Sequence, residues 1–240
     1  RQHVLLIGEP GTGKSKLSME LSKLIDGSKY FQWLLTRFTT PEEIFGALNL
    51  KEFENGIHVR NTKDKLPEAH FGFLDEVFKA NSAILNSLLT LINERLFYNN
   101  GTPTPSPLMT VIGASNEFPE EDENLEALYD RFLLRYEVEQ VKEDTNFISV
   151  LKGQGNNVEV PSITLNELTE LQFFCELISI NENVFEAIRD IRKELSDEGI
   201  HPSVRRFEKS VRLLQARAML QERQQVELKD LVILEHILWN

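Results

Sequence analysis

Residues 8 to 15 read GEPGTGKS, directly after the apolar run HVLLI at 3–7. The eight residues match the pattern G-x-x-x-x-G-K-[ST], in which a glycine-rich turn leads from a buried strand into a helix. Backbone N–H groups without a helical partner, together with the helix dipole, favour an anion at such a helix N-terminus. The following residues place an apolar face at helical spacing, formed by Leu17, Leu21, Leu24 and Ile25. A strand, a glycine turn and a helix in this order predict a phosphate-binding loop.

Each residue type in this loop suits the phosphates of a nucleotide. Gly8, Gly11 and Gly13 allow the main chain to fold around a β-phosphate. We expect Lys14 to reach the β- and γ-phosphates as a point charge, and Ser15 to offer its hydroxyl to Mg²⁺. The predicted nucleotide-binding residues are Gly8, Glu9, Pro10, Gly11, Thr12, Gly13, Lys14, Ser15 and Lys16. The alternative is a glycine turn that binds no nucleotide, which the flanking strand and helix disfavour.

The composition of the chain limits its class and its partners. With 240 residues, 41% of them hydrophobic, the chain can bury a sizeable core in one or two domains. The 38 acidic and 26 basic residues give a formal net charge of −12, whereas binding to a phosphate backbone needs clustered Lys and Arg. Nucleic acid is therefore disfavoured as the primary ligand, although a local basic pore stays open. A protein partner is favoured.

The sequence also indicates where the protein works. It contains no apolar run of the roughly 20 residues that a membrane span needs, and no recognisable secretory leader. The chain starts almost inside its first strand, so we expect further sequence upstream and give the missing leader little weight. The single cysteine, Cys175, excludes an intrachain disulfide, fits a reducing compartment and lies in an apolar helical stretch that favours a core position. We expect a cytoplasmic protein.

Residues 1–150 alternate short β-rich runs with helical patterns, which predicts an α/β fold with helices on the faces of a parallel sheet. We expect strands near 3–7, 31–36, 70–74, 109–114 and 133–138, and helices near 14–25, 41–46, 80–95 and 123–130. The polar insert 47–69 contains Asn55-Gly56 between apolar residues and predicts a small hairpin. The stretch 99–107 has too many prolines for a central strand and predicts a loop.

The pattern changes after about residue 141. Residues 153–157 read GQGNN and predict a linker loop. Beyond this loop, four amphipathic helical faces recur, at 165–175, 184–195, 211–218 and 228–238. We therefore predict an α/β nucleotide-binding domain over 1–150, followed by a small all-α lid domain over 158–240.

A second motif supplies acidic groups. Residues 71–76 read FGFLDE, an apolar strand that ends in two adjacent carboxylates. Asp75 is well placed to hold Mg²⁺ through water, and Glu76 to polarise the water that attacks a γ-phosphate. An apolar strand followed by Asp-Glu is also common helix-capping sequence. The position on a buried strand downstream of a phosphate-binding loop favours the functional interpretation.

Two further positions complete the candidate site. The apolar strand 109–114 leads to Ser115-Asn116, and parallel strands end at one crevice, so we expect Asn116 to orient the lytic water beside the γ-phosphate. A turn asparagine is the alternative. Arg131 lies far in topology from the phosphate-binding loop of its own chain, which suits insertion into a neighbour's site. A surface pair with Asp130 or Glu126 is the alternative that composition leaves open.

Together these motifs resemble an AAA+ ATPase of the MoxR family, close to its RavA branch. The matching segments are 8–15, 36–46, 66–69, 73–76, 89–95, 114–116, 125–131 and 203–206, which cover the chain almost end to end. The resemblance implies that Asn116 is the first sensor, Arg131 the arginine finger and Arg205 the second sensor, with the adjacent Arg206 as the alternative. The implied catalytic residues are Glu76, Asn116, Arg131 and Arg205, and the implied metal ligands are Ser15 and Asp75. The insert 47–69 would face the pore of a ring.

The resemblance further implies a module that binds and hydrolyses MgATP, forms a ring that we expect to be a hexamer, and remodels or activates a protein partner as a chaperone does. A finger that acts in trans requires one face of each copy to meet a different face of the next, and such contacts close only as a cycle. The implied partner carries a von Willebrand factor A domain.

Two alternative functions stay open. One is a nucleotide-gated assembly scaffold, for which Glu76 and Arg131 would have no use. The other is the ATP- or GTP-driven subunit of a DNA-processing system, which the acidic charge disfavours.

Overall fold

The computed structural model describes residues 2–119, 123–153 and 161–239. The chain forms two compact units, one up to residue 162 and the other from residue 163 on. The predicted linker loop at 153–157 and the predicted domain boundary fall mostly on 154–160, outside the described residues. Across the described ranges, the helices are too short or too polar for any of them to cross a membrane.

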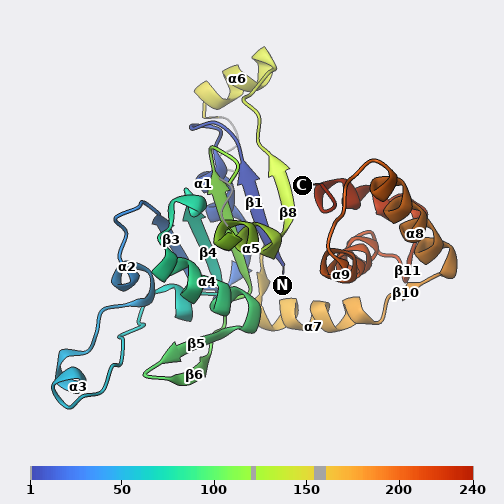
Figure 1. Ribbon diagram of the computed structural model, residues 1–240. Coiled ribbons are helices and arrows are strands. Elements are labelled where there is room, and N and C mark those ends of the chain that lie inside the picture. Colours follow the sequence, from blue (N-terminus) through green and yellow to red (C-terminus); the bar gives the residue numbers. More distant parts are fainter. Residues whose placement is uncertain (1, 120–122, 154–160, 240) are drawn as a thin grey trace. The chain divides into compact units, whose positions relative to one another are not determined.

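The first unit is built on a five-stranded parallel sheet (Figure 1). Its strands, in spatial order, are β3 (Tyr30–Leu34), β4 (Phe71–Asp75), β7 (Thr110–Ser115), β1 (His3–Ile7) and β8 (Phe132–Glu137). Every neighbouring pair is parallel. The predicted parallel α/β fold is therefore confirmed. Strands that are covered on both faces have nearly continuous apolar sequences, which is why these five could be predicted.

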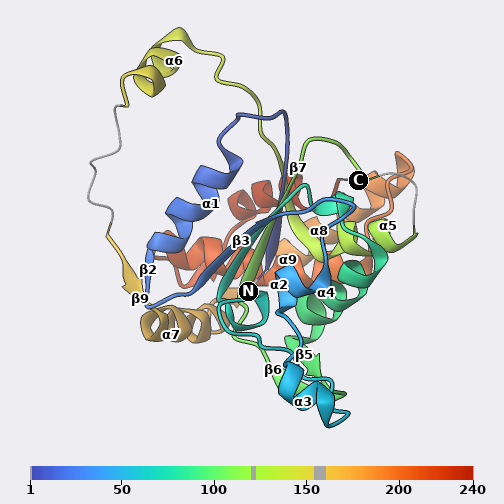
Figure 2. The same cartoon turned by 90° about the vertical axis from the view of Figure 1, so that its left-hand side faces the viewer.

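Helices cover both faces of this sheet. Figure 2 shows α1 (Lys14–Lys23) on one side, and α4 (Ser82–Glu94) and α5 (Glu123–Arg131) on the other. The apolar face expected of α1 does not pack fully, because Leu17 and Leu21 remain 49% and 46% exposed. The helix buries Ser18 instead, and the Tyr30 hydroxyl donates a hydrogen bond to the Ser18 hydroxyl (3.2 Å). A small side chain at this position lets α1 approach the sheet closely.

The insert 47–69 differs from the predicted hairpin. It contains a short helix, α3 (Leu50–Glu54), and an isolated bridge between Leu48 and Arg60. The side chain of Asn49 caps α3 by accepting a hydrogen bond from the N–H of Lys51 (3.1 Å). Asn55 and Gly56 therefore end a helix instead of forming a hairpin turn. The capped helix α3 already provides hydrogen-bond partners for the backbone groups that a hairpin turn would otherwise pair.

The stretch 99–107 differs from the predicted loop. Much of it belongs to an antiparallel hairpin of β5 (Leu96–Asn99) and β6 (Thr102–Pro105). Asn100 and Gly101 form the turn at φ 52° and 73°, the two positive values that a type I′ turn needs. A two-stranded ribbon leaves one side of each strand without a ladder, so β6 tolerates its prolines.

The second unit is mainly helical. Its α-helices are α7 (Leu165–Glu176), α8 (Glu182–Asp197) and α9 (Val204–Leu220), whereas the fourth predicted helix is a 3-10 helix, η3 (Leu228–His236). The two-residue strands β10 (Ser179–Ile180) and β11 (Gln225–Val226) pair in parallel. The core contains Val184, Leu214, Ala218 and Val226. Cys175 is also buried, and burial raises the pKa of its thiol.

The remaining elements are short. They are β2 (Ile25–Asp26), α2 (Pro41–Phe45), η1 (Leu66–Glu68), η2 (Val77–Lys79), α6 (Asp144–Leu151) and β9 (Ile163–Thr164). The sequence pattern did not predict α6, an eight-residue helix that has no buried residue.

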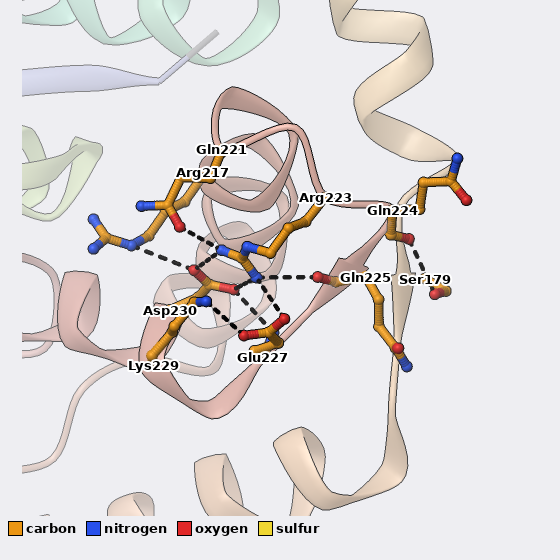
Figure 3. A network of polar contacts seen from close by, with 9 residues as sticks. All are labelled: Ser179, Arg217, Gln221, Arg223, Gln224, Gln225, Glu227, Lys229 and Asp230. Carbon is orange, nitrogen blue, oxygen red and sulfur yellow. Dashed lines mark hydrogen bonds and ion pairs between the residues drawn. The ribbon is translucent and has the colours of Figure 1, made fainter.

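A buried ion pair fixes η3 within the second unit (Figure 3). The carboxylate of the fully buried Asp230 accepts two hydrogen bonds from the Arg223 guanidinium, at 2.8 Å and 2.6 Å. It also accepts one from the N–H of Glu227 (2.9 Å) and lies 3.4 Å from Nε of Arg217. The bonds from Arg223 hold the pKa of Asp230 below its usual range. Asp230 is therefore ionised in the folded second unit, and its charge contributes to the stability of that unit.

Candidate nucleotide-binding site

The glycine-rich loop begins where β1 ends. Gly8 donates its N–H to the carbonyl oxygen of Ser115 (3.0 Å), which ties the loop to the end of β7. A Cβ atom at Gly8 would lie 2.2 Å from the carbonyl oxygen of Val138, so the close approach requires glycine. Gly11 and Gly13 have φ values of 83° and 86°, in the left-handed region that favours glycine. Gly13 caps α1, a helix whose first N–H groups have no acceptor within the helix.

Lys14 lies at the centre of the loop and is only 7% exposed. Its ammonium group donates hydrogen bonds to the carbonyl oxygens of Gly8 (2.6 Å) and Glu9 (2.9 Å). The Thr12 hydroxyl also donates to the carbonyl oxygen of Glu9 (3.0 Å). The loop thus wraps around one positive charge, an arrangement that suits a phosphate anion.

The outer residues of the loop are more open. Glu9, Pro10 and Lys16 are exposed. The carboxylate of Glu9 accepts a hydrogen bond from the side-chain amide of Gln140, which follows β8. This contact connects the loop to the strand on the far side of β1 from β7.

The structure brings Glu76 and Asn116 together at the ends of the adjacent strands β4 and β7. The amide nitrogen of Asn116 donates a hydrogen bond to Oε1 of Glu76, and its amide oxygen accepts one from Nζ of Lys14 (3.3 Å). Asn116 therefore bridges the loop cation and the carboxylate. Glu76 adopts φ 52° and ψ 45°, a left-handed conformation that costs a non-glycine residue about 1–2 kcal/mol. Such strained residues cluster at functional sites.

The residues predicted to hold Mg²⁺ have suitable chemistry. Asp75 is the last residue of β4, and its Oδ1 accepts a hydrogen bond from the N–H of Glu76 (3.1 Å). In the described parts of the chain, no three His, Cys, Asp or Glu side chains form a group that could hold a metal. Mg²⁺ does not require such a group, because it binds through one or two carboxylates together with phosphates and waters. Asp75 and the Ser15 hydroxyl would hold the ion, which would neutralise phosphate charge.

Sequence reasoning missed Lys79, which lies beside Glu76. Its ammonium group is 2.9 Å from Oε2 of Glu76, and the hydrogen bond and charge of Glu76 raise the pKa of Lys79. Both residues line a cavity of about 420 Å³, together with Arg37, Glu117, Phe118 and others. A base three residues after the acid was a signal in the sequence, but only the 3-10 turn η2 makes the two side chains meet.

Arg131 is the last residue of α5. Its guanidinium lies 3.3 Å from Oδ2 of Asp130, as the surface-pair alternative expected, and the side chain is 19% exposed. Its role towards a neighbouring copy stays a prediction. Arg135 fixes the junction of α5 and β8, where Arg131 lies. The guanidinium of Arg135 stacks 3.4 Å above the Tyr129 ring and donates a hydrogen bond to the Tyr129 carbonyl oxygen (3.0 Å). The alternation of β8 gave no sign that this arginine would be fully buried.

The two lid arginines differ in exposure. Both lie in the first turn of α9, where Arg206 is 3% exposed and Arg205 is exposed. A residue that senses the phosphates of a bound nucleotide must present its guanidinium outside its own unit. Arg205 therefore stays our prediction for the second sensor.

Comparisons with known proteins identify the family of the chain. Residues 1–174 match the model of the MoxR domain in the MoxR-vWA-beta-propeller ternary systems, and residues 183–240 match that of an AAA lid domain. Over its full length the chain is 42% and 40% identical to two uncharacterized proteins of Methanocaldococcus jannaschii, MJ0079 and MJ0812. It spans 62% and 64% of the lengths of these relatives.

A solved structure supports the fold. A protein of Cytophaga hutchinsonii, described as a candidate ATPase, superposes with a TM-score of 0.78 over the whole of this chain and 77% of that one, at 20% identity. The family itself is shown by the MoxR-domain model, which matches well over half of the residues. The chain therefore belongs to the MoxR family of AAA+ ATPases.

Proposed function

We propose that this chain binds ATP with Mg²⁺ and hydrolyses it. One observation carries the proposal: Asn116 joins the loop cation Lys14 to the carboxylate of Glu76 at one edge of the sheet. A cation for phosphates and a base for water are the two groups that hydrolysis of a phosphoric anhydride needs side by side. The family supports ATP as the nucleotide.

Each of the three side chains has its own part in the proposed reaction. Lys14 binds the β- and γ-phosphates, and Asn116 orients a water molecule against the γ-phosphorus. The water oxygen forms a bond to phosphorus while the bond to the ADP oxygen breaks, and Glu76 takes the proton that the water loses. Ser15 and Asp75 would hold Mg²⁺, which would supply positive charge to the phosphates.

Two substitutions separate binding from turnover. Lys14→Ala should lose both, because Lys14 contacts ground-state phosphates, whereas Glu76→Gln should keep ATP binding and lose turnover, because Glu76 acts on the attacking water. Isothermal titration with ATP and a phosphate-release assay measure the two effects. Lys23→Ala is the control, since Lys23 lies on the same helix and is exposed. Undiminished hydrolysis by the Glu76→Gln variant would remove Glu76 from the mechanism.

The assembly and the partner are also proposals. A ring, which we expect to be a hexamer, would place Arg131 in the site of the neighbouring copy, and Arg205 would report nucleotide state to the lid. The match to the MoxR domain of MoxR-vWA-beta-propeller systems supports a partner that carries a von Willebrand factor A domain. Placement near the RavA branch stays a prediction that rests on the sequence motifs. A pull-down with the Glu76→Gln variant tests the partner, because a stalled ring should retain it.

A further inference from the structure

Lys79 contacts the carboxylate on which the proposed hydrolysis depends. Glu76 immediately precedes the 3-10 turn η2 and Lys79 is its last residue, and in such a turn side chains three residues apart eclipse each other. The main chain closes the turn through a hydrogen bond from the N–H of Lys79 to the carbonyl oxygen of Glu76 (2.8 Å). The side chains close it again through the ion pair of 2.9 Å. The backbone conformation therefore brings Lys79 onto Glu76.

Both carboxylate oxygens of Glu76 accept hydrogen bonds in this arrangement. Oε1 accepts from the amide of Asn116, and Oε2 accepts from the ammonium of Lys79. The Glu76 side chain is only 13% exposed, so few directions remain from which a water molecule can approach it. Each of these oxygens has two lone pairs, so a water that gives its proton to Glu76 must either reach the second lone pair of an oxygen in this enclosed site or displace the donor already there.

The Lys79 side chain has room to adopt a second position, away from Glu76. This side chain is 51% exposed on the wall of the 420 Å³ cavity beside Glu76. Glu117 lines the same cavity and attracts the ammonium, while Arg37 repels it. The ion pair can thus open by rotation of an exposed side chain, without any rearrangement of the sheet.

We propose that Lys79 restrains Glu76, and that hydrolysis is faster when this ion pair is open. The inference rests on the proposed ATPase function. Lys79 acts through Glu76 and is a positioning residue. Its position on η2 makes the restraint intrinsic to each copy, and a contact that draws Lys79 into the cavity would release the carboxylate.

Substitution of Lys79 tests the restraint in the full chain. Lys79→Met should raise kcat about two- to fivefold with an unchanged KM for ATP, a small factor because partly exposed ion pairs are weak. Lys79→Arg keeps a cation and should restore the low rate. Lys23→Met is the matched control, because Lys23 pairs with Glu20 at the same distance of 2.9 Å and the same spacing of three residues.

Two kinetic results would overturn the inference. One is a Lys79→Met rate equal to that of the Lys23→Met control. The other is a fall in kcat that Lys79→Arg rescues, which would make the ion pair a requirement for catalysis.

A crystal structure of the wild type with Mg²⁺ and a non-hydrolysable ATP analogue gives a readout without turnover. Separation of Nζ of Lys79 from Oε2 of Glu76 beyond the ion-pair limit supports the restraint, and a retained pair with a water in line for attack overturns it. If the wild type shows no ATPase activity, the proposed function fails, and this structure still decides whether the pair opens.

Discussion

Gly8 lies where the main chain of the phosphate-binding loop passes close to the main chain of Val138, the residue that follows β8. A Cβ atom there would meet the carbonyl oxygen of Val138 at 2.2 Å, and main-chain atoms cannot rotate away. We expect Gly8→Ala to lower the free energy of unfolding by about 3 kcal/mol, the upper end of the usual cost of overpacking, and to weaken ATP binding. Gly11→Ala is the comparison: its Cβ would meet nothing within 4 Å, and only the φ of 83° costs about 1–2 kcal/mol. Equal losses in denaturant unfolding would mean that the Val138 contact does not govern the loop.

Single residues also show where prediction from sequence ends. Lys14, Glu76 and Asn116 could be placed near one another because each follows an apolar strand and parallel strands end at a common edge. The contact between Lys79 and Glu76 depends on a turn conformation that no periodicity records. The burial of Arg135 depends on its stacking against Tyr129, a residue of another element.

Among the helices and strands, the η3 segment of the lid depends on one buried carboxylate. Asp230→Asn removes the charge that Arg223 binds at 2.6 Å and 2.8 Å, and we expect Tm to fall by roughly 5–10 °C. The lowered pKa of Asp230 sets the pH dependence: the pair stabilises the fold above the unfolded pKa of about 3.9, and this stability is lost as the pH falls through the lowered value. Thermal unfolding between pH 7 and pH 3 should therefore be less pH-dependent in Asp230→Asn. Asp190→Asn is the control, since the Arg189–Asp190 pair is exposed. A control loss as large as that of Asp230→Asn would contradict the prediction.

Several elements that differ from the sequence prediction, in place or in type, share a physical cause. The five central strands and the long helices carry apolar patterns because tertiary packing selects them. The β5–β6 hairpin, α3 and η3 are set by turn and cap geometry over a few residues, where the same sequence is compatible with more than one local structure. Asn55-Gly56 and Asn100-Gly101 illustrate this, because only the second pair forms a hairpin turn.

For the whole assembly, Arg131 provides the test of a shared active site. It pairs with Asp130 within its own chain at a distance of 3.3 Å. Ion pairs of this kind are weak, so an incoming phosphate group would readily replace Asp130 as the partner of Arg131. If Arg131 acts in trans, Arg131→Ala should bind ATP almost normally and lose on the order of a thousandfold in turnover. The wild-type rate should rise faster than linearly with protein concentration as rings assemble. Arg131→Lys is the comparison, because it keeps the charge and loses the two-pronged geometry.

Mixing two inactive variants decides between a finger and a structural arginine. Arg131→Ala subunits retain Glu76, and Glu76→Gln subunits retain the arginine, so a mixed ring contains interfaces at which an intact Glu76 meets an intact Arg131. Turnover that reappears only when subunits exchange would establish that two copies build each site. With exchange confirmed independently, for example by energy transfer between labelled subunits, the absence of recovery would assign Arg131 to its pair with Asp130. The same result would remove the geometric reason for a ring, because contacts that share no site have no need to close into a cycle.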